Sequence, residues 1–166
     1  MKTDDNLKAA FAGESQANRK YTAFSRKAGQ EVLPNVAKLF RAAAEAETVH
    51  ALSHLKTMKG VGSTTDNLKA AIEGEVYEHT QMYPEFIKVA ESEKRIDARV
   101  TFDNANKVEQ IHAELYQEAI NAVKTGKDLP PTEYYVCQVC GNTVKGQPPD
   151  KCPICGAPKN QFKKVE

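Results

Sequence analysis

Residues Glu47-Thr-Val-His50 recur in this chain as Glu109-Gln-Ile-His112, and this repeated Glu-x-x-His motif decides the fold. Residues three apart on an α-helix lie on the same face, one turn apart. Each copy can therefore offer a carboxylate oxygen and an imidazole nitrogen to the same point. Bundles that hold two metal ions take such a motif from each of two helices and a single glutamate from each of the other two. The repeat predicts a helical bundle built around a metal site.

Glutamates at matched distances before each motif complete this pattern. Glu14 precedes Glu47 by 33 residues and Glu75 precedes Glu109 by 34, so the two halves look like one helical hairpin used twice. Glu78 lies three residues after Glu75 and adds one further carboxylate. Ionised carboxylates that face one another in an apolar core would each cost several kcal/mol, and two divalent cations would neutralise most of that charge.

A simpler interpretation of each motif competes with this one. A single Glu-x-x-His on a glutamate-rich helix is usually a solvated face, and it is the second copy with its matched glutamate that favours ligation. His54 and His79 lie outside the pattern. Tyr21 and Tyr83 follow the first glutamate of their hairpins by seven and eight residues. Each is either a core aromatic or a hydrogen-bond donor to a ligand carboxylate. Carboxylates combined with two imidazoles suit iron or manganese better than zinc or copper.

Apolar residues recur at intervals of three and four from Asn6 to about Lys124, which is the period of amphipathic helices. Glycine, proline, serine and threonine interrupt the period at residues 29–34, 60–66 and 92–97. We therefore expect four long helices, at 4–28, 34–59, 66–92 and 97–124. The composition changes after Gly126, so we expect a helical domain at 1–128, a linker at 129–133 and a small domain at 134–166.

All four cysteines lie in two CxxCG knuckles, Cys137-Gln-Val-Cys140-Gly and Cys152-Pro-Ile-Cys155-Gly. Two such knuckles that face each other form a tetrahedral site for zinc or for one iron. The cysteines are too close together in the chain for a disulfide framework and fit thiolate ligands in a reducing compartment. From their spacing alone, a structural zinc ribbon explains them at least as well as an iron centre.

Charge and hydropathy exclude two classes of partner. The chain has 23 lysines and arginines against 22 aspartates and glutamates, with the signs interleaved, so nothing indicates a nucleic-acid partner. The first residues are polar, and no run of about 18 apolar residues occurs, so neither a secretory signal nor a membrane partner is indicated. We expect a cytoplasmic protein.

The chain resembles a rubrerythrin over essentially all of its length. The resemblance is carried by both knuckles and by Ala10-Phe-Ala-Gly-Glu14-Ser, Ala46-Glu47-Thr-Val-His50-Ala, Gly74-Glu75-Val-Tyr-Glu78, Met82-Tyr83-Pro84-Glu-Phe and Glu109-Gln-Ile-His112-Ala-Glu. It implies an all-α ferritin-like four-helix bundle followed by a small rubredoxin-like domain, without haem. It implies di-iron ligands at Glu14, Glu47, His50, Glu75, Glu78, Glu109 and His112, and ligands for a single iron at Cys137, Cys140, Cys152 and Cys155.

The resemblance also implies a function, which is the reduction of hydrogen peroxide to water for protection against oxidative stress. Electrons would begin on NAD(P)H, arrive through a reductase or a rubredoxin and pass through the cysteine-bound iron. One iron would move between His50 and Glu78, and the cysteine module of one subunit would lie near the di-iron site of its neighbour. One alternative is a ferritin-like protein that oxidises and buffers iron, which needs no electron carrier. Another is a zinc-ribbon adaptor.

The link between the second and third expected helices predicts a dimer. These helices run parallel in a ferritin-like bundle, so the link must return along it by about 26 Å or more. Residues 59–66 reach only about 28 Å when fully stretched, and Gly60-Val-Gly62 suggests a turn instead. We therefore expect a domain-swapped homodimer, in which the first two helices of one chain complete a bundle with the last two of another.

Overall fold

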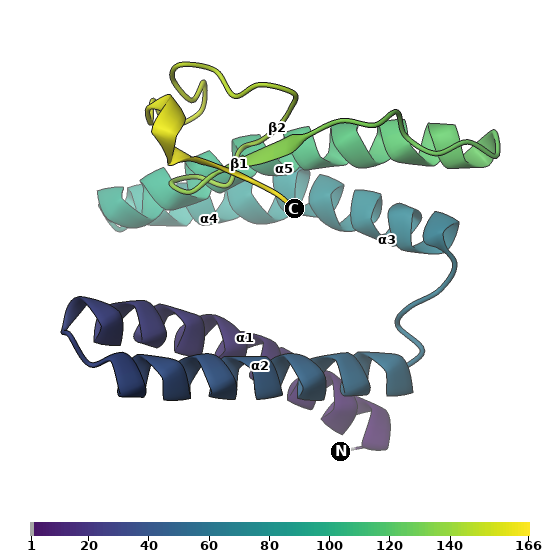
Figure 1. The fold of residues 1–166 in the computed structure, drawn as a ribbon. Helices are drawn as coiled ribbons and strands as arrows, with labels where there is room; N and C mark the ends of the chain where they lie inside the picture. The colour runs from purple at the N-terminus through teal and green to yellow at the C-terminus, as the bar shows by residue number, and fades with distance from the viewer. Residues whose placement is uncertain (1) are drawn as a thin grey trace. The chain divides into compact units, whose positions relative to one another are not determined.

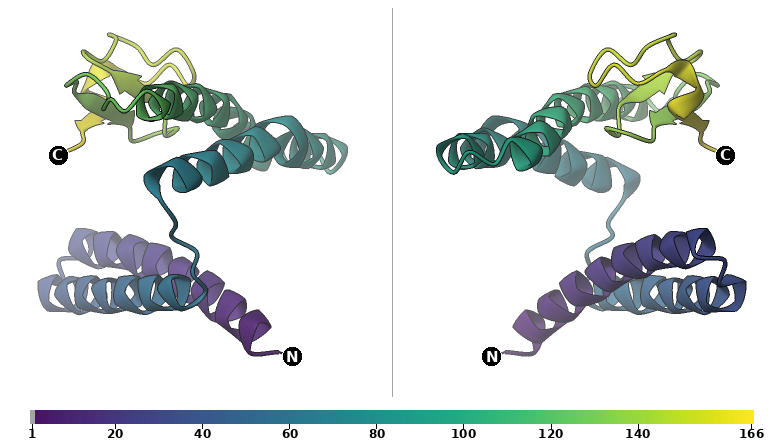
Figure 2. Two further views of the ribbon diagram at one scale, coloured as in Figure 1. Left: turned by 90° about the vertical axis from the view of Figure 1, so that its right-hand side faces the viewer. Right: turned by 90° about the vertical axis from the view of Figure 1, so that its left-hand side faces the viewer.

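Two compact units make up the chain, divided between Gly62 and Ser63. The computed structural model describes residues 2–166. The first unit is a helical hairpin, and the second contains the remaining helices and a small sheet (Figures 1 and 2). Among the described residues, no helix is long and apolar enough to cross a membrane.

The first unit consists of α1 (Thr3–Gln30) and α2 (Pro34–Thr57), which pack side by side. Alanines form most of the buried contact surface, including Ala37, Ala44 and Ala51 on α2. Small side chains allow two helices to approach closely, but they leave the larger apolar residues outside. Leu39 is 68% exposed and Leu52 is 58% exposed. The hairpin alone therefore leaves much of its apolar surface uncovered.

The second unit begins with a long helical rod in three parts, α3 (Thr64–Tyr77), a π-helical turn at Glu78–Met82, and α4 (Tyr83–Ser92). The Ser63 hydroxyl caps α3 by accepting a hydrogen bond from the Asp66 backbone N–H at 3.2 Å. Pro84 lies two residues after the end of the π-turn. A proline clashes with the carbonyl four residues before it and cannot donate to it, so a wider turn at this point lets the helix continue.

The rod packs against α5 (Ile96–Lys124), and the pair repeats the internal structure of the α1–α2 hairpin. In each pair a tyrosine and two phenylalanines cluster, with the phenylalanine rings 5.6 Å apart in both. The members are Tyr21, Phe24 and Phe40 in the first unit, and Tyr83, Phe86 and Phe102 in the second. The sequence interpretation of one hairpin used twice thus agrees with the packing inside each unit.

The cysteine module forms a three-stranded antiparallel sheet in the order β2-β1-β3, from β1 (Tyr134–Cys137), β2 (Thr143–Lys145) and β3 (Phe162–Lys164), with a 3₁₀ turn at Lys159–Gln161. Its core contains Cys137, Cys152 and Ala157, with Phe162 packed against them. The module lies along α5, where Lys145 forms an ion pair with Glu118. So small a core depends on whatever the sulfur atoms bind.

The four helices expected from the sequence are confirmed to within two residues at every end. The expectation missed the π-turn within the third helix, because periodicity identifies a helical segment but not an extra residue inside one. Three non-glycine residues have positive φ, Val32, Lys59 and Lys94, and each lies two residues after the end of a helix. Only six residues, 58–63, join α2 to α3, fewer than the eight expected.

Candidate metal centres

The first unit brings together three of the expected ligands, Glu14, Glu47 and His50. One ligand atom from each lies within 4.8 Å of the others. The Nδ1 atom of His50 lies 2.9 Å from Glu47 Oε2. Hydrogen bonds lower the pKa of Glu47, chiefly the bond with His50 and then the one with Glu14. The two carboxylates are half-buried and the imidazole is exposed, so the cluster opens at the surface of its unit.

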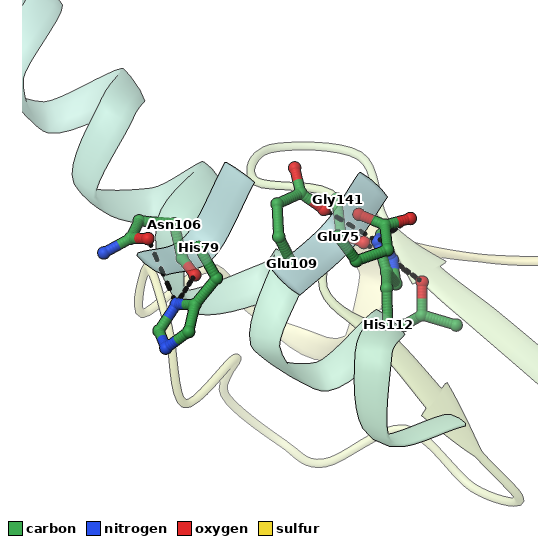
Figure 3. Close-up of polar contacts among 7 residues, drawn as sticks. Glu75, His79, Asn106, Glu109, His112 and Gly141 are labelled. Atoms are coloured by element: carbon green, nitrogen blue, oxygen red, sulfur yellow. Dashed lines mark hydrogen bonds and ion pairs between the residues drawn. The ribbon is translucent and has the colours of Figure 1, made fainter. Parts of the chain in front are cut away.

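The second unit repeats this cluster with Glu75, Glu109 and His112 (Figure 3), again within 4.8 Å of one another. The Nδ1 atom of His112 lies 2.8 Å from Glu109 Oε2 and 3.8 Å from Glu75 Oε1. All three residues are half-buried. Each Glu-x-x-His motif therefore directs its carboxylate and its imidazole to one point, together with a glutamate from the neighbouring helix.

Carboxylates crowd the second cluster more than the first. Burial and then the charge of Glu109 raise the pKa of Glu75 to about 7. Burial and the same charge also raise the pKa of Glu78, the first residue of the π-turn. The carboxylates therefore resist full ionisation together, and a bound cation would remove that resistance.

A short chain of hydrogen bonds runs from His112 to the first cysteine knuckle. His112 Nε2 lies 3.0 Å from Thr143 Oγ1, and the Thr143 hydroxyl donates to the Gly141 carbonyl at 3.2 Å. Because the hydroxyl proton is used there, the Thr143 oxygen accepts a hydrogen bond from the Nε2–H group of His112. That arrangement leaves the Nδ1 lone pair of His112 facing the Glu109 carboxylate. Two lone pairs 2.8 Å apart require a proton or a metal ion between or beside them.

These donor sets fit two divalent metal ions. Each cluster offers two carboxylates and one imidazole. Glu78 is not part of the second cluster, although the charge of Glu109 acts on its carboxyl. Hard oxygen donors with few nitrogens and no sulfur favour iron or manganese. Three protein ligands leave coordination positions for a further carboxylate or a substrate. The residues present thus suit metals that react with small molecules.

The two tyrosines expected beside the ligands behave differently. Burial, followed by the charges of Glu109, Glu78 and Glu75, raises the pKa of Tyr83, so its hydroxyl lies within electrostatic reach of the second cluster. Tyr21 packs in the aromatic cluster of the first unit. Among the described residues, neither hydroxyl donates a hydrogen bond to a ligand carboxylate within its own unit.

The first histidine outside the motif, His79, has a different role. Its Nδ1 atom lies 2.9 Å from the Asn106 carbonyl, a bond between the π-turn and α5 (Figure 3). In the first unit Asn18 makes the equivalent bond to the Ala44 carbonyl, at 2.6 Å. Both carbonyls belong to the residue three positions before the motif glutamate. His79 therefore joins two helices. Its position four residues after Glu75 matches that of Asn18 after Glu14, and this match could have identified its role from the sequence. The other, His54, is not part of either cluster.

The four cysteines form a third cluster, with their sulfurs within 4.8 Å of one another. Cys137 Sγ lies 3.8 Å from Cys155 Sγ, and Cys140 Sγ lies 3.6 Å from Cys152 Sγ, so the two knuckles face each other. Burial raises the pKa of Cys140. Burial opposes ionisation of Cys152 too, but backbone N–H groups of Cys155 and Ile154 outweigh it and lower that pKa to about 7. Four thiolates at such distances need a cation.

Sequence reasoning missed Thr143, which contacts His112 on α5, and Asn142, whose side chain donates to Cys152 Sγ inside the module. The contact of Thr143 depends on how the folded module lies on α5, and that of Asn142 depends on how the two knuckles face each other. The resemblance implied that the module would serve the site of a neighbouring subunit. In the structure, Thr143 contacts His112 of the same chain. One chain therefore already joins a carboxylate cluster to the cysteine centre.

Comparison with known proteins gives consistent matches along the chain. The family model described as rubrerythrin matches residues 5–120, and the model for the rubredoxin-like domain of rubrerythrin matches residues 135–163. Rubrerythrin-2 of Clostridium acetobutylicum is 37% identical, over 96% of this chain and 95% of that protein. Nigerythrin of Nitratidesulfovibrio vulgaris is 36% identical, over 96% and 85%. A solved structure of fully reduced, all-ferrous nigerythrin matches with a TM-score of 0.59 and 34% identity, over 99% of this chain and 87% of that one.

Proposed function

We propose that this chain, which belongs to the rubrerythrin family, is a non-haem di-iron peroxidase. It reduces hydrogen peroxide to water. The expected fold class, an all-α ferritin-like bundle with a small rubredoxin-like domain, is confirmed. In the proposed working unit, residues 1–128 provide the bundle, 129–133 the linker and 134–166 the cysteine domain. It acts in the cytoplasm, where thiols stay reduced.

The hydrogen bond between His112 and Thr143 carries this proposal. It joins the carboxylate cluster on α5 to the module that holds the cysteines, at 3.0 Å. An iron held by four cysteines is a one-electron carrier, and a carrier that adjoins a di-iron site can reload it. A ferritin-like protein that only oxidises and buffers iron has no use for such a contact. The contact therefore favours a reductase over the ferroxidase alternative.

The proposed ligands are the seven expected carboxylate and histidine residues for the iron pair and the four cysteines for the single iron. They are Glu14, Glu47, His50, Glu75, Glu78, Glu109 and His112, and Cys137, Cys140, Cys152 and Cys155. When bound, two ferrous ions supply the two electrons that, with two protons, convert one hydrogen peroxide into two waters. The Tyr83 hydroxyl keeps its proton, because its pKa is raised, and offers a hydrogen-bond donor beside the cluster.

His50 and Glu78 are proposed to alternate as ligands to one of the two irons. His50 is the exposed member of the first cluster, and its ring is held by a single contact to Glu47. Glu78 is held in the π-turn, where burial and Glu109 disfavour its free charge. A carboxylate ligand suits the ferric state and an imidazole suits the ferrous state. The exchange would follow the oxidation state of the site.

The electrons are proposed to start on NAD(P)H and to reach the cysteine-bound iron through a separate reductase or a rubredoxin. The test is a metal analysis of anaerobically purified protein combined with stopped-flow mixing of the reduced form. We expect about three irons per chain, fast oxidation by peroxide and slow oxidation by air. Turnover should then continue with NADPH and a reductase. Faster oxidation by air than by peroxide would establish the ferroxidase instead, and one zinc per chain with no iron would establish the adaptor.

The two carboxylate clusters are proposed to meet in a domain-swapped homodimer. His50 lies seven residues before the end of α2, and Glu75 lies eleven residues after the start of α3. Parallel helices would need the link to return roughly 27 Å to bring these two residues level. The seven Cα–Cα steps from Thr57 to Thr64 span at most about 25 Å. A link within one chain is too short, so the clusters of two different chains complete each site.

Complementation between two defective chains tests the swap. One variant carries Glu47→Ala in the first unit, and the other carries Glu109→Ala in the second. In a swapped heterodimer one site receives both defects and the other receives none. Co-expression should therefore restore about one quarter of the wild-type peroxidase sites, because half of the dimers are mixed. No recovery in verified heterodimers would place all ligands of one site in one chain.

A further inference from the structure

The two cysteine knuckles have the same backbone hydrogen bonds and differ in one side chain. The N–H of Cys137 donates to the Asn142 carbonyl at 2.9 Å, and the N–H of Cys152 donates to the Ala157 carbonyl at 2.7 Å. The glycine that follows each second cysteine has positive φ and donates back to the first cysteine at 2.9 Å. Asn142 and Ala157 therefore occupy equivalent positions, and they differ only in the side chain.

The Asn142 side chain is buried beside the cluster of sulfurs. It is 1% exposed, and its Nδ2 atom donates to Cys152 Sγ of the opposite knuckle at 3.6 Å. Its backbone N–H points to the Cys140 sulfur and favours the thiolate there. One residue thus donates to a sulfur of each knuckle. Ala157 is also buried, at 9% exposed, but it has no side-chain donor to offer in return.

Packing does not explain an amide at this position. The Asn142 Oδ1 atom is buried and has no hydrogen-bond partner among the described residues. An unpaired buried acceptor destabilises a fold, and a leucine, which branches at the same atom, would avoid that cost. Rotating the amide would direct an oxygen at the Cys152 thiolate and leave the N–H groups unpaired. The orientation seen is the one that favours negative charge on sulfur.

We propose that the Asn142 side chain raises the reduction potential of the iron held by the four cysteines. Reduction adds one electron from the donor to that iron, forms or breaks no bond and leaves the centre one unit more negative. An N–H dipole with its positive end at a ligand sulfur stabilises the reduced, more negative form more than the oxidised form. In a buried site of low dielectric the effect is large, and hydrogen bonds to sulfur are a known control of such potentials.

The proposal rests on the part of the proposed function that assigns iron to the cysteines, and not on the peroxide reaction. Its test is a spectroelectrochemical titration of the iron-loaded full chain without peroxide. Asn142→Leu removes the donor and keeps the branching of the side chain at Cγ. Asn160→Leu is the matched control, since Asn160 is an exposed asparagine of the same module. We expect a more negative midpoint for Asn142→Leu, an unchanged midpoint for Asn160→Leu and an unfolding transition no lower than that of the wild type.

An Asn142→Leu midpoint equal to or above the wild-type value would overturn the proposal. Because the variant could fail to bind iron, a measurement on the wild type is made alongside. In protein loaded with ¹¹³Cd, a side-chain N–H that donates to a cadmium-bound sulfur gives a scalar coupling between that proton and the metal. We expect this coupling for an Asn142 Nδ2 proton. Its absence, with couplings from backbone N–H groups present, would overturn the proposal without any substitution.

Discussion

Replacing Thr143 with valine isolates the contact between the carboxylate cluster and the cysteine module. Valine keeps the shape of threonine and removes only the hydroxyl. His112 then loses the acceptor 3.0 Å from its Nε2 atom, and the Gly141 carbonyl loses its donor. Loss of an ordinary hydrogen bond costs about 1 kcal/mol. Loss of a partner that orients a metal-binding imidazole typically weakens metal binding by about 10- to 100-fold.

The effect should appear in two measurements. Competition between the metal-free protein and a chelator should show ferrous affinity of the carboxylate site falling by at least about tenfold, while the cysteine site keeps its affinity. Stopped-flow reduction should show slower transfer of electrons from the cysteine-bound iron to the oxidised pair. The reason is that the ring is no longer fixed between the two centres.

Two further variants make the result specific. Thr143→Ser restores the hydroxyl and should recover both values. Thr101→Val removes an exposed hydroxyl from α5, the helix that carries His112. This hydroxyl donates to the Ala98 carbonyl of its own turn, so its loss should change neither value. Wild-type affinity and wild-type transfer rate in Thr143→Val would refute the reasoning, because the contact would then be incidental to both centres.

Three other predictions concern single features of the chain. Glu78→Ala should slow peroxide turnover and leave the red ferric-thiolate absorption unchanged, and unchanged turnover in a steady-state assay would exclude Glu78 as a ligand. In metal-free protein, burial raises the pKa of Glu75 from 4.5 to about 7, so the folded state holds the proton more tightly than the unfolded state. The contribution of Glu75 to stability is therefore most favourable below about pH 4.5 and is lost as the pH rises to about 7; comparison of urea unfolding between the wild type and Glu75→Gln should show this loss. Val32→Gly should stabilise the α1–α2 turn by about 1 kcal/mol, because Val32 has φ +58° and a β-branched side chain is strained there; an unchanged urea midpoint would count against that strain.

The sequence alone predicted the helices and the residues that cluster on each hairpin, since both depend on short-range spacing. A period of 3.6 residues marks a buried face, and a three-residue interval brings Glu47 to His50 and Glu109 to His112. The cysteine knuckles are also short-range sequence patterns. Thr143 could not be found in this way, because its contact with His112 spans 31 positions and depends on how the module lies on α5. No local pattern specifies such docking.

The π-turn is a different case, because the sequence contained its signal. Tyr21 precedes His50 by 29 residues, and Tyr83 precedes His112 by the same number, so the hairpins match along that whole length. The one extra residue of the second hairpin must therefore lie between Glu75 and its tyrosine, and that is where the π-turn stands.

The same insertion lies next to a second difference between the two hairpins. Three residues after Glu14 the first hairpin has Ala17, whereas three residues after Glu75 the second has Glu78, where the π-turn begins. The surplus carboxylate and the surplus residue thus occur together. A π-turn absorbs one residue without rotating the helix beyond it, so the aromatic cluster around Tyr83 keeps its packing while the helix widens beside the metal ligands. The second hairpin then has one carboxylate more than the first, which is the asymmetry that the proposed exchange of ligands between His50 and Glu78 requires.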